Sequence, residues 1–139
     1  MPTTTRTKTP ATAEVTDLWP LLFVHDMKRS LAFYEEQLGF TRVGAAKGDD
    51  GAIFWCRLQR GRASLMLQQD CAEDGPTAGR GRGVGLYVIC DDADRLYAEF
   101  TARGLALAPP TTAYYGMRQL TVPEPDGYYL CFESPVAPH

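Results

Sequence analysis

Hydrophobic positions along the chain follow one arrangement twice. In the first copy, an apolar run over residues 18–24 is followed by Asp26, by apolar residues three or four positions apart, and by Gly39. The second copy has the same order, from residues 84–89 through Asp91 or Asp92 to Gly104. Each copy predicts a strand, a helix that begins at the aspartate and ends at the glycine, and a further strand. A repeat of this length predicts two similar modules with a ligand site between them.

The helical segments are predicted from the spacing of their apolar residues. One face of the first segment carries Met27, Leu31, Tyr34 and Leu38. One face of the second carries Ala93, Leu96, Tyr97 and Phe100. An apolar stripe at this period is typical of a helix that packs on a sheet, so we expect both faces to be buried.

Alternating residues and turn signals predict the remaining strands. They lie at residues 40–43, 52–58, 63–68, 105–108, 117–122 and 128–133. The turn Pro125-Asp126-Gly127 favours a hairpin, because proline fixes φ and glycine accepts a positive φ. Pro20 lacks a donor, which predicts an edge or a bend in the first strand.

Both copies are therefore βαβββ, and the predicted fold class is α+β. We expect a curved mixed sheet around a central cavity, with the helices outside. The predicted organisation is a disordered tail at 1–16, a first module at 17–69, a linker at 70–83 and a second module at 84–135.

Composition narrows the choice of partner. The chain has 139 residues, of which 45% are hydrophobic, and a net charge of −3 without a basic stripe, which predicts no nucleic-acid partner. No apolar run approaches the roughly 20 residues of a membrane span, and residues 1–16 lack the apolar core of a secretory signal. Cys56, Cys71, Cys90 and Cys131 are therefore expected to be reduced in a cytoplasmic protein.

Three stretches resemble the vicinal oxygen chelate superfamily. They are the segment from Leu21 to Tyr34, Leu38-Gly39-Phe40, and the turn Glu124-Pro125-Asp126-Gly127-Tyr128. This superfamily contains glyoxalase I, extradiol dioxygenases, fosfomycin-resistance enzymes and bleomycin-resistance proteins, and the resemblance covers residues 18–134. It implies the fold, but because one scaffold hosts lyases, oxygenases and binding proteins, it does not choose among them.

The resemblance also implies where a metal would be bound. Enzymes of the superfamily hold a divalent metal with His, Glu or Gln from equivalent strands, and the matching positions here are Trp19, Met66, Gly85 and Cys131. A lone thiolate does not hold a catalytic divalent ion, so we expect no metal and no cofactor. The chain then resembles the metal-free bleomycin-resistance branch. A one-residue slip that brings Gln68 and Glu133 to the metal keeps a glyoxalase-like lyase or an extradiol-type dioxygenase as the alternative.

Strand alternation places a largely apolar and aromatic set on the sheet face away from the helices. The expected ligand-binding residues are Trp19, Leu21, Phe23, Met66, Gln68, Tyr87, Tyr115, Gln119, Thr121, Cys131 and Glu133. This lining suits a flat, partly aromatic organic ligand, and Glu133 is a candidate for a cationic ligand group or a base. The alternative is that these side chains pack on one another or on a partner chain, and that Tyr114 and Tyr115 pack within their loop.

The pattern favours binding over catalysis. No nucleophile–base set and no phosphate-binding glycine motif are present, so no catalytic residue is predicted. The main hypothesis is a homodimeric, metal-independent protein that sequesters a small molecule, as antibiotic-resistance proteins of this kind do. A structural or regulatory module without a ligand is a third possibility. The resemblance further implies exchange of the N-terminal strand between subunits at a proline, and Pro20 stands in the matching place.

Overall fold

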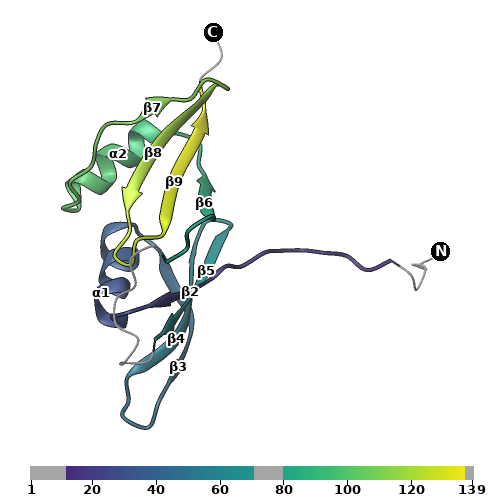
Figure 1. Cartoon of the computed structure of the whole chain (residues 1–139), viewed down its shortest axis with the longest axis vertical. Coiled ribbons are helices and arrows are strands. Elements are labelled where there is room, and N and C mark those ends of the chain that lie inside the picture. Colours follow the sequence, from purple (N-terminus) through teal and green to yellow (C-terminus); the bar gives the residue numbers. More distant parts are fainter. Residues whose placement is uncertain (1–11, 71–79, 137–139) are drawn as a thin grey trace.

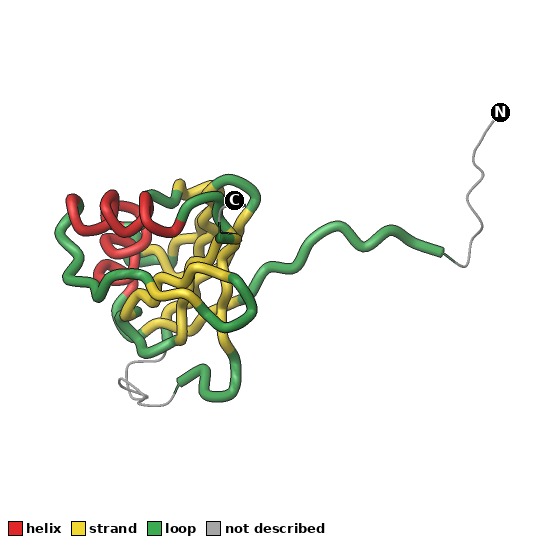
Figure 2. The backbone as a smooth tube through the Cα atoms, turned by 90° about the horizontal axis from the view of Figure 1, so that it is seen from above, coloured by secondary structure: helices red, strands yellow, loops and turns green. Residues whose placement is uncertain are grey.

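The computed structural model describes residues 12–70 and 80–136, and within them it contains two four-stranded sheets (Figure 1). Viewed from above, the helices lie on one side of the sheets (Figure 2). The predicted α+β class with two βαβββ modules is confirmed. Parts of the predicted tail and linker, including Cys71, lie outside the described residues.

The two sheets have the same topology. The first has the order β2-β5-β4-β3 and the second β6-β9-β8-β7, and in each the first pair is parallel and the others are antiparallel. The first module contains β2 (Leu21–Val24), α1 (Met27–Leu31), the π-helical η1 (Ala32–Gln37), β3 (Thr41–Lys47), β4 (Ile53–Arg60) and β5 (Ala63–Gln69). The second contains β6 (Gly85–Ile89), α2 (Ala93–Ala102), β7 (Thr111–Thr112), β8 (Met117–Pro123) and β9 (Tyr129–Pro135).

Each helix begins in the same way. The carboxylates of Asp26 and Asp92 accept the N–H three residues on, at 3.3 and 3.1 Å. The first helical N–H is bound at 2.9 Å by a side chain from the neighbouring strand, Gln69 Oε1 for α1 and Ser134 Oγ for α2. These contacts satisfy donors that a helix cannot pair internally, and they fix each helix to its own sheet.

The core lies between the helices and the sheets. The predicted face of the first helical segment is buried, and so are Ala93 and Phe100 of α2. The other two residues of the predicted α2 face, Leu96 and Tyr97, are only partly buried against this core. Alternation places seven strand residues toward the helices. Six of them are buried, namely Leu22, Val24, Leu65, Leu67, Leu130 and Phe132, and the seventh, Val88, is partly buried. The opposite sheet faces stay open in the single chain.

Polar contacts join the two modules. The guanidinium of Arg60 forms a two-pronged ion pair with Glu99 of α2 at 2.8 and 2.9 Å, and it also donates to the carbonyl of Leu38 at 2.7 Å. Asp126 of the Pro-Asp-Gly turn accepts the N–H of His25 at 2.9 Å. The turn therefore docks on the first module in addition to reversing the chain.

Three predicted elements are wrong in detail. The first strand begins at Leu21 and not at residue 18, because only the carbonyl of Pro20 pairs with β5. Residues 105–108 form no strand. The edge strand is Thr111–Thr112 and begins only after Pro109 and Pro110, because these two prolines have no N–H to donate to a ladder. The first helix becomes π-helical after Leu31. In the described parts of the chain, no helix is long and apolar enough to cross a membrane.

Candidate functional site

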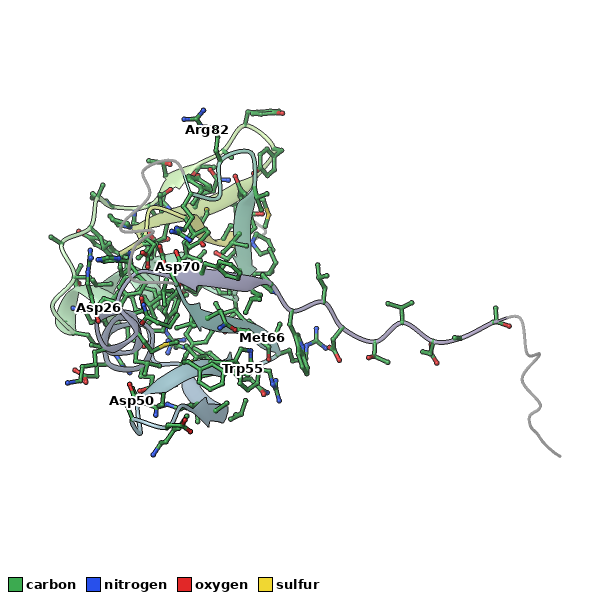
Figure 3. The ribbon with its side chains drawn as sticks, turned by 60° about the horizontal axis from the view of Figure 1, so that its bottom comes forward. Asp26, Asp50, Trp55, Met66, Asp70 and Arg82 are labelled. Carbon is green, nitrogen blue, oxygen red and sulfur yellow. The ribbon has the colours of Figure 1, made fainter. Side chains whose placement is uncertain are left out.

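The open faces of the two sheets carry the predicted site residues. Trp55 and Met66 lie on the side of the first sheet away from Asp26, the N-cap of α1 (Figure 3). The parallel pairing sets Leu21 opposite Met66 in the first sheet and Tyr87 opposite Cys131 in the second. The repeat thus brings corresponding positions of both modules to the same kind of surface.

The open face of the first module is organised around Arg57. Its guanidinium lies 4.1 Å from the centre of the Trp19 ring and donates to Ser64 Oγ at 3.0 Å. Arg57 pairs with Met66 across the hairpin, so it belongs to the same face. A cation stacked on an indole that is 42% exposed leaves a flat apolar ring available beside a positive charge.

Sequence reasoning missed the contribution of β4 to this face. Trp55 and Arg57 stand opposite Gln68 and Met66 and alternate with the buried Cys56. The signal was present, because alternation along residues 52–58 assigns these two side chains to the face that Met66 shares. Trp55 also packs against Gly44 of the edge strand.

The open face of the second module holds a hydrogen-bonded carboxylate. Oε1 of Glu133 accepts the amide of Gln119 at 3.0 Å and the hydroxyl of Tyr115 at 3.3 Å, and the Gln119 amide also donates to Tyr115 at 2.7 Å. Two effects raise the pKa of the Tyr115 hydroxyl: the larger is burial, and the next is the negative charge of Glu133. The loop before β8 is thereby tied to the sheet.

Tyrosine rings continue this face beyond the carboxylate. Tyr87 and Tyr129 lie with ring centres 5.8 Å apart, and hydrogen bonding with Tyr129 raises the pKa of Tyr87 to about 12. Thr121 lies 3.5 Å from the Tyr129 hydroxyl. Cys131 is fully buried between strands, and burial raises the pKa of its thiol, so the sulfur stays protonated near neutral pH.

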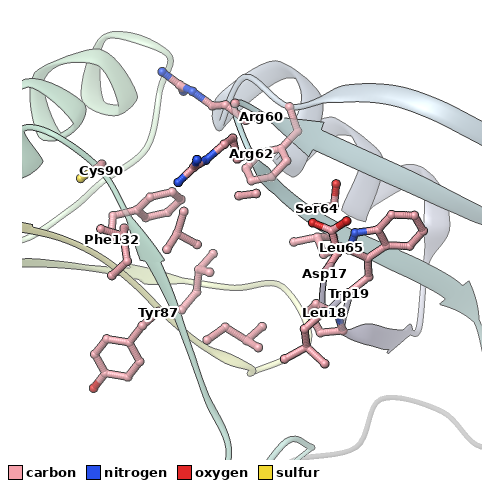
Figure 4. A pocket seen from close by; sticks show the side chains of 18 of the residues that line it. Asp17, Leu18, Trp19, Arg60, Arg62, Ser64, Leu65, Tyr87, Cys90 and Phe132 are labelled. Carbon is pink, nitrogen blue, oxygen red and sulfur yellow. The ribbon is translucent and has the colours of Figure 1, made fainter. Parts of the chain in front are cut away.

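A groove of about 1160 Å³ runs between the modules (Figure 4). Its walls are the segment before β2, the turn between β4 and β5, and strand β6. Of the predicted residues, it brings together Trp19 and Tyr87, which lie on opposite sides of it. The remaining predicted residues do not line this groove, namely Leu21, Phe23, Met66, Gln68, Tyr115, Gln119, Thr121, Cys131 and Glu133. Of these, Cys131 is fully buried and so presents no surface to a ligand, and Tyr115 lies in the loop before β8.

The donor set at the metal positions does not fit a divalent ion. A side chain at Gly85 would begin 2.9 Å from the ring of Tyr87 and 3.2 Å from that of Tyr129, so these two rings occupy the space that a ligand would need. The indole of Trp19 is stacked under Arg57, and the thiol of Cys131 is buried and protonated. Across residues 12–70 and 80–136, no group of three His, Cys, Asp or Glu side chains is arranged to hold a metal.

Comparison with known proteins gives a match over most of the chain. The model of the Glyoxalase/Bleomycin resistance protein/Dioxygenase superfamily matches residues 15–132. A search of curated proteins found no match.

Three solved structures are similar to this chain. One is the antibiotic binding protein TnmS3 from Streptomyces sp. CB03234, with 25% identity and a TM-score of 0.67 over 89% of this chain and 99% of that chain. A bleomycin resistance determinant encoded on the transposon Tn5 has 23% identity and a TM-score of 0.69 over 87% and 98%. A glyoxalase/bleomycin resistance protein/dioxygenase from Nocardioides has 20% identity and a TM-score of 0.66 over 92% and 89%. The last two likenesses establish the shared fold.

Proposed function

Since the chain belongs to the Glyoxalase/Bleomycin resistance protein/Dioxygenase superfamily, we propose that it is a metal-independent binding protein that sequesters a small, partly aromatic organic molecule. The binding cavity is built from the open sheet faces of two subunits. The role is protective, as in antibiotic resistance, and it requires no catalytic residue.

The observation that carries this proposal is the apolar character of the open faces. Leu21, Phe23, Tyr87 and Tyr129 are each more than two-fifths exposed, and Ile89 is 64% exposed. Large exposed apolar surface on a small protein marks a site of ligand or protein contact. Rings framed by a few polar groups are the lining that a flat organic ligand requires.

The donor set supports independence from metal. Tyrosine rings fill the space at Gly85, and no hard ligand stands at Trp19 or Met66. Lewis-acid chemistry on a chelated oxygen pair needs carboxylate or imidazole ligands with open coordination positions. This chain presents aromatic surface at those positions, which serves stacking better than coordination.

The open faces also support a homodimer. A half-sheet needs a second layer to cover its apolar side, and in a two-fold dimer each subunit supplies that layer to the other. The segment before β2 extends away from the sheets (Figure 2), and its Val15 and Leu18 are about nine-tenths exposed. We infer that this arm packs on the partner subunit, with the chain turning at Pro20.

Two of the similar structures support the class of ligand. One is named as an antibiotic binding protein and another as a bleomycin resistance determinant. A natural product with fused or linked aromatic rings is therefore the ligand class that we propose for this chain.

A thermal-shift screen with added chelator tests the proposal. Purified protein is heated with a panel of aromatic antibiotics and aromatic metabolites, with and without EDTA. A compound that binds the folded state raises Tm, by mass action, and a rise that is unchanged by EDTA is the expected result. A rise that EDTA abolishes, or turnover of the bound compound, would instead favour the lyase or dioxygenase alternative.

A further inference from the structure

Glu133 is a buried carboxylate with one oxygen committed to the protein. The residue is 8% exposed, and both of its side-chain hydrogen bonds, from Gln119 and Tyr115, end on Oε1. Oε2 accepts no hydrogen bond from the described residues. The protein therefore orients this carboxylate through one oxygen, and the other accepts nothing from residues 12–70 and 80–136.

No cation of the described chain neutralises this carboxylate. Arg118, on the neighbouring strand, is committed to Asp94 of α2 at 3.1 Å. In residues 12–70 and 80–136, the ion pairs join other partners, and none involves Glu133. A carboxylate held out of bulk water has a strong electrostatic preference for a positive group, because the local dielectric screens it poorly.

Apolar and aromatic side chains near Glu133 suit an organic cation, in which a positive group is attached to an apolar or aromatic framework. Ile89 stands opposite Glu133 on β6, and Tyr87 is the next residue of β6 on the same face. Tyr115, whose hydroxyl binds Glu133, is about half exposed, so its ring is accessible beside the carboxylate. The ring of Tyr87 is similarly exposed and lies farther along the face, against Tyr129. Aromatic faces attract cations through the ring quadrupole, and this attraction is larger where water is excluded.

We propose that Glu133, with Tyr115, forms a subsite for the positively charged group of an aromatic ligand, such as an aromatic amine or an amidinium. The flat body of the ligand lies along Ile89 and the Tyr87–Tyr129 pair. This inference rests on the proposed binding function and specifies the chemistry of its ligand.

The first module carries no such charge at the matching position. Gln68 pairs with Phe23 as Glu133 pairs with Ile89, so the two residues are equivalent in the repeat. That face instead carries the guanidinium of Arg57, which stands opposite Met66. The ligand's positive end is therefore assigned to the second module and not to the first.

Two acridines that differ in charge test the subsite. At pH 7, 9-aminoacridine is a cation, whereas acridine is largely neutral and has the same ring body. We expect the unmodified protein to bind 9-aminoacridine about tenfold more tightly, the preference that one charge-assisted contact supplies. Titration followed by dye fluorescence gives both Kd values.

Matched variants assign the preference to one carboxylate. Glu133→Gln keeps the size and the acceptor at Oε1, and we expect it to bind both dyes with similar Kd. Asp49→Asn removes one negative charge from an exposed turn and should keep the full preference. Circular dichroism of each variant establishes that it is folded.

The outcomes separate this inference from the function on which it rests. If the unmodified protein binds both acridines equally, or if Glu133→Gln keeps the preference, the cationic subsite is wrong while aromatic binding stands. If neither dye binds, the aromatic-ligand function fails together with the subsite. The first comparison needs no variant, so equal affinity for the two dyes overturns the subsite even if Glu133→Gln does not fold.

Discussion

The hydroxyl of Tyr34 donates a hydrogen bond of 2.9 Å to Oε2 of Glu124, and both residues are buried. The bond connects the helical segment of the first module to the turn before the last strand of the second. Oε1 of Glu124 accepts the N–H groups of Asp126 and Tyr128 at 2.7 and 3.2 Å. This one carboxylate thus orders the turn and fastens it to the other module.

Removing the hydroxyl should destabilise the protein. Tyr34→Phe leaves a buried carboxylate oxygen without its donor, so we expect a loss of about 1–3 kcal/mol in the free energy of unfolding. Urea denaturation measures this loss. Tyr97→Phe is the control, because the Tyr97 hydroxyl makes no hydrogen bond to the described residues, and it should change stability by less than about 0.5 kcal/mol. Equal effects of the two variants would contradict this role for the bond.

Glu124 should make stability depend on pH. Burial raises the pKa of Glu124 above its ordinary value of 4.5, and the Tyr34 hydrogen bond opposes the rise only in part. Above the unfolded pKa, the folded state still holds a proton that the unfolded chain has released, so this contribution to stability is lost as pH rises through the folded pKa. Glu124→Gln should remove it, and Tm measured at steps from pH 4.5 upward should fall less than in the parent. Parallel Tm profiles would contradict the assignment.

The Arg60–Glu99 ion pair should contribute modestly to the free energy of unfolding, and its two single variants should lose different amounts of stability. Both side chains are about one-third exposed, so solvent screens the ion pair, and a double-mutant cycle should give a coupling of about 0.5–1 kcal/mol. Arg60→Gln should cost more than Glu99→Gln. Arg60 also donates to the carbonyl of Leu38 at 2.7 Å, whereas the second partner of Glu99 is the longer and more exposed ion pair with Arg103 at 3.3 Å. Chemical denaturation of the two single variants and the double variant provides the test, and a larger loss in Glu99→Gln would reverse this reading.

A charge on the open face should break the dimer. We expect Ile89→Lys to shift the protein toward monomer in light scattering at micromolar concentration, because it would bury an ammonium group at the interface. Val43→Lys, at the edge strand β3 and also exposed, should leave the dimer intact. A parent protein that is already monomeric at that concentration would refute the dimer itself.

Trp19 should report on bound ligand. A flat ring that stacks near this indole changes its fluorescence, and Trp55 contributes a second signal, so the comparison is between the parent and Trp19→Phe. We expect Trp19→Phe to lose most of the ligand-induced change. If the change is fully retained, the ligand does not approach Trp19.

The order of residues along the first helix was enough to predict its cap and its buried face, because both depend on residues close together in the sequence. The cap at Asp26 and the buried face of the first helical segment follow from spacing and side-chain chemistry alone, and the structure confirms them. For the second helix the sequence offers Asp91 or Asp92, and in the structure the cap is Asp92. The role of Glu124 could not be predicted, because it depends on how two separately patterned modules meet. The indole–guanidinium stack of Trp19 and Arg57 likewise joins residues whose contact is set by tertiary packing.

The π-helical segment explains how the two copies differ in length. The stretch from Asp26 to Gly39 is one residue longer than that from Asp92 to Gly104. Tyr34 and Phe100 nevertheless stand equally far from their aspartates, and the carbonyl of each accepts the first N–H beyond the glycine, from Phe40 at 2.9 Å and Leu105 at 3.1 Å. The wider turn therefore absorbs a single-residue insertion after Tyr34. An alignment of the two copies should carry its gap at that point, where an added residue leaves the following strand in register.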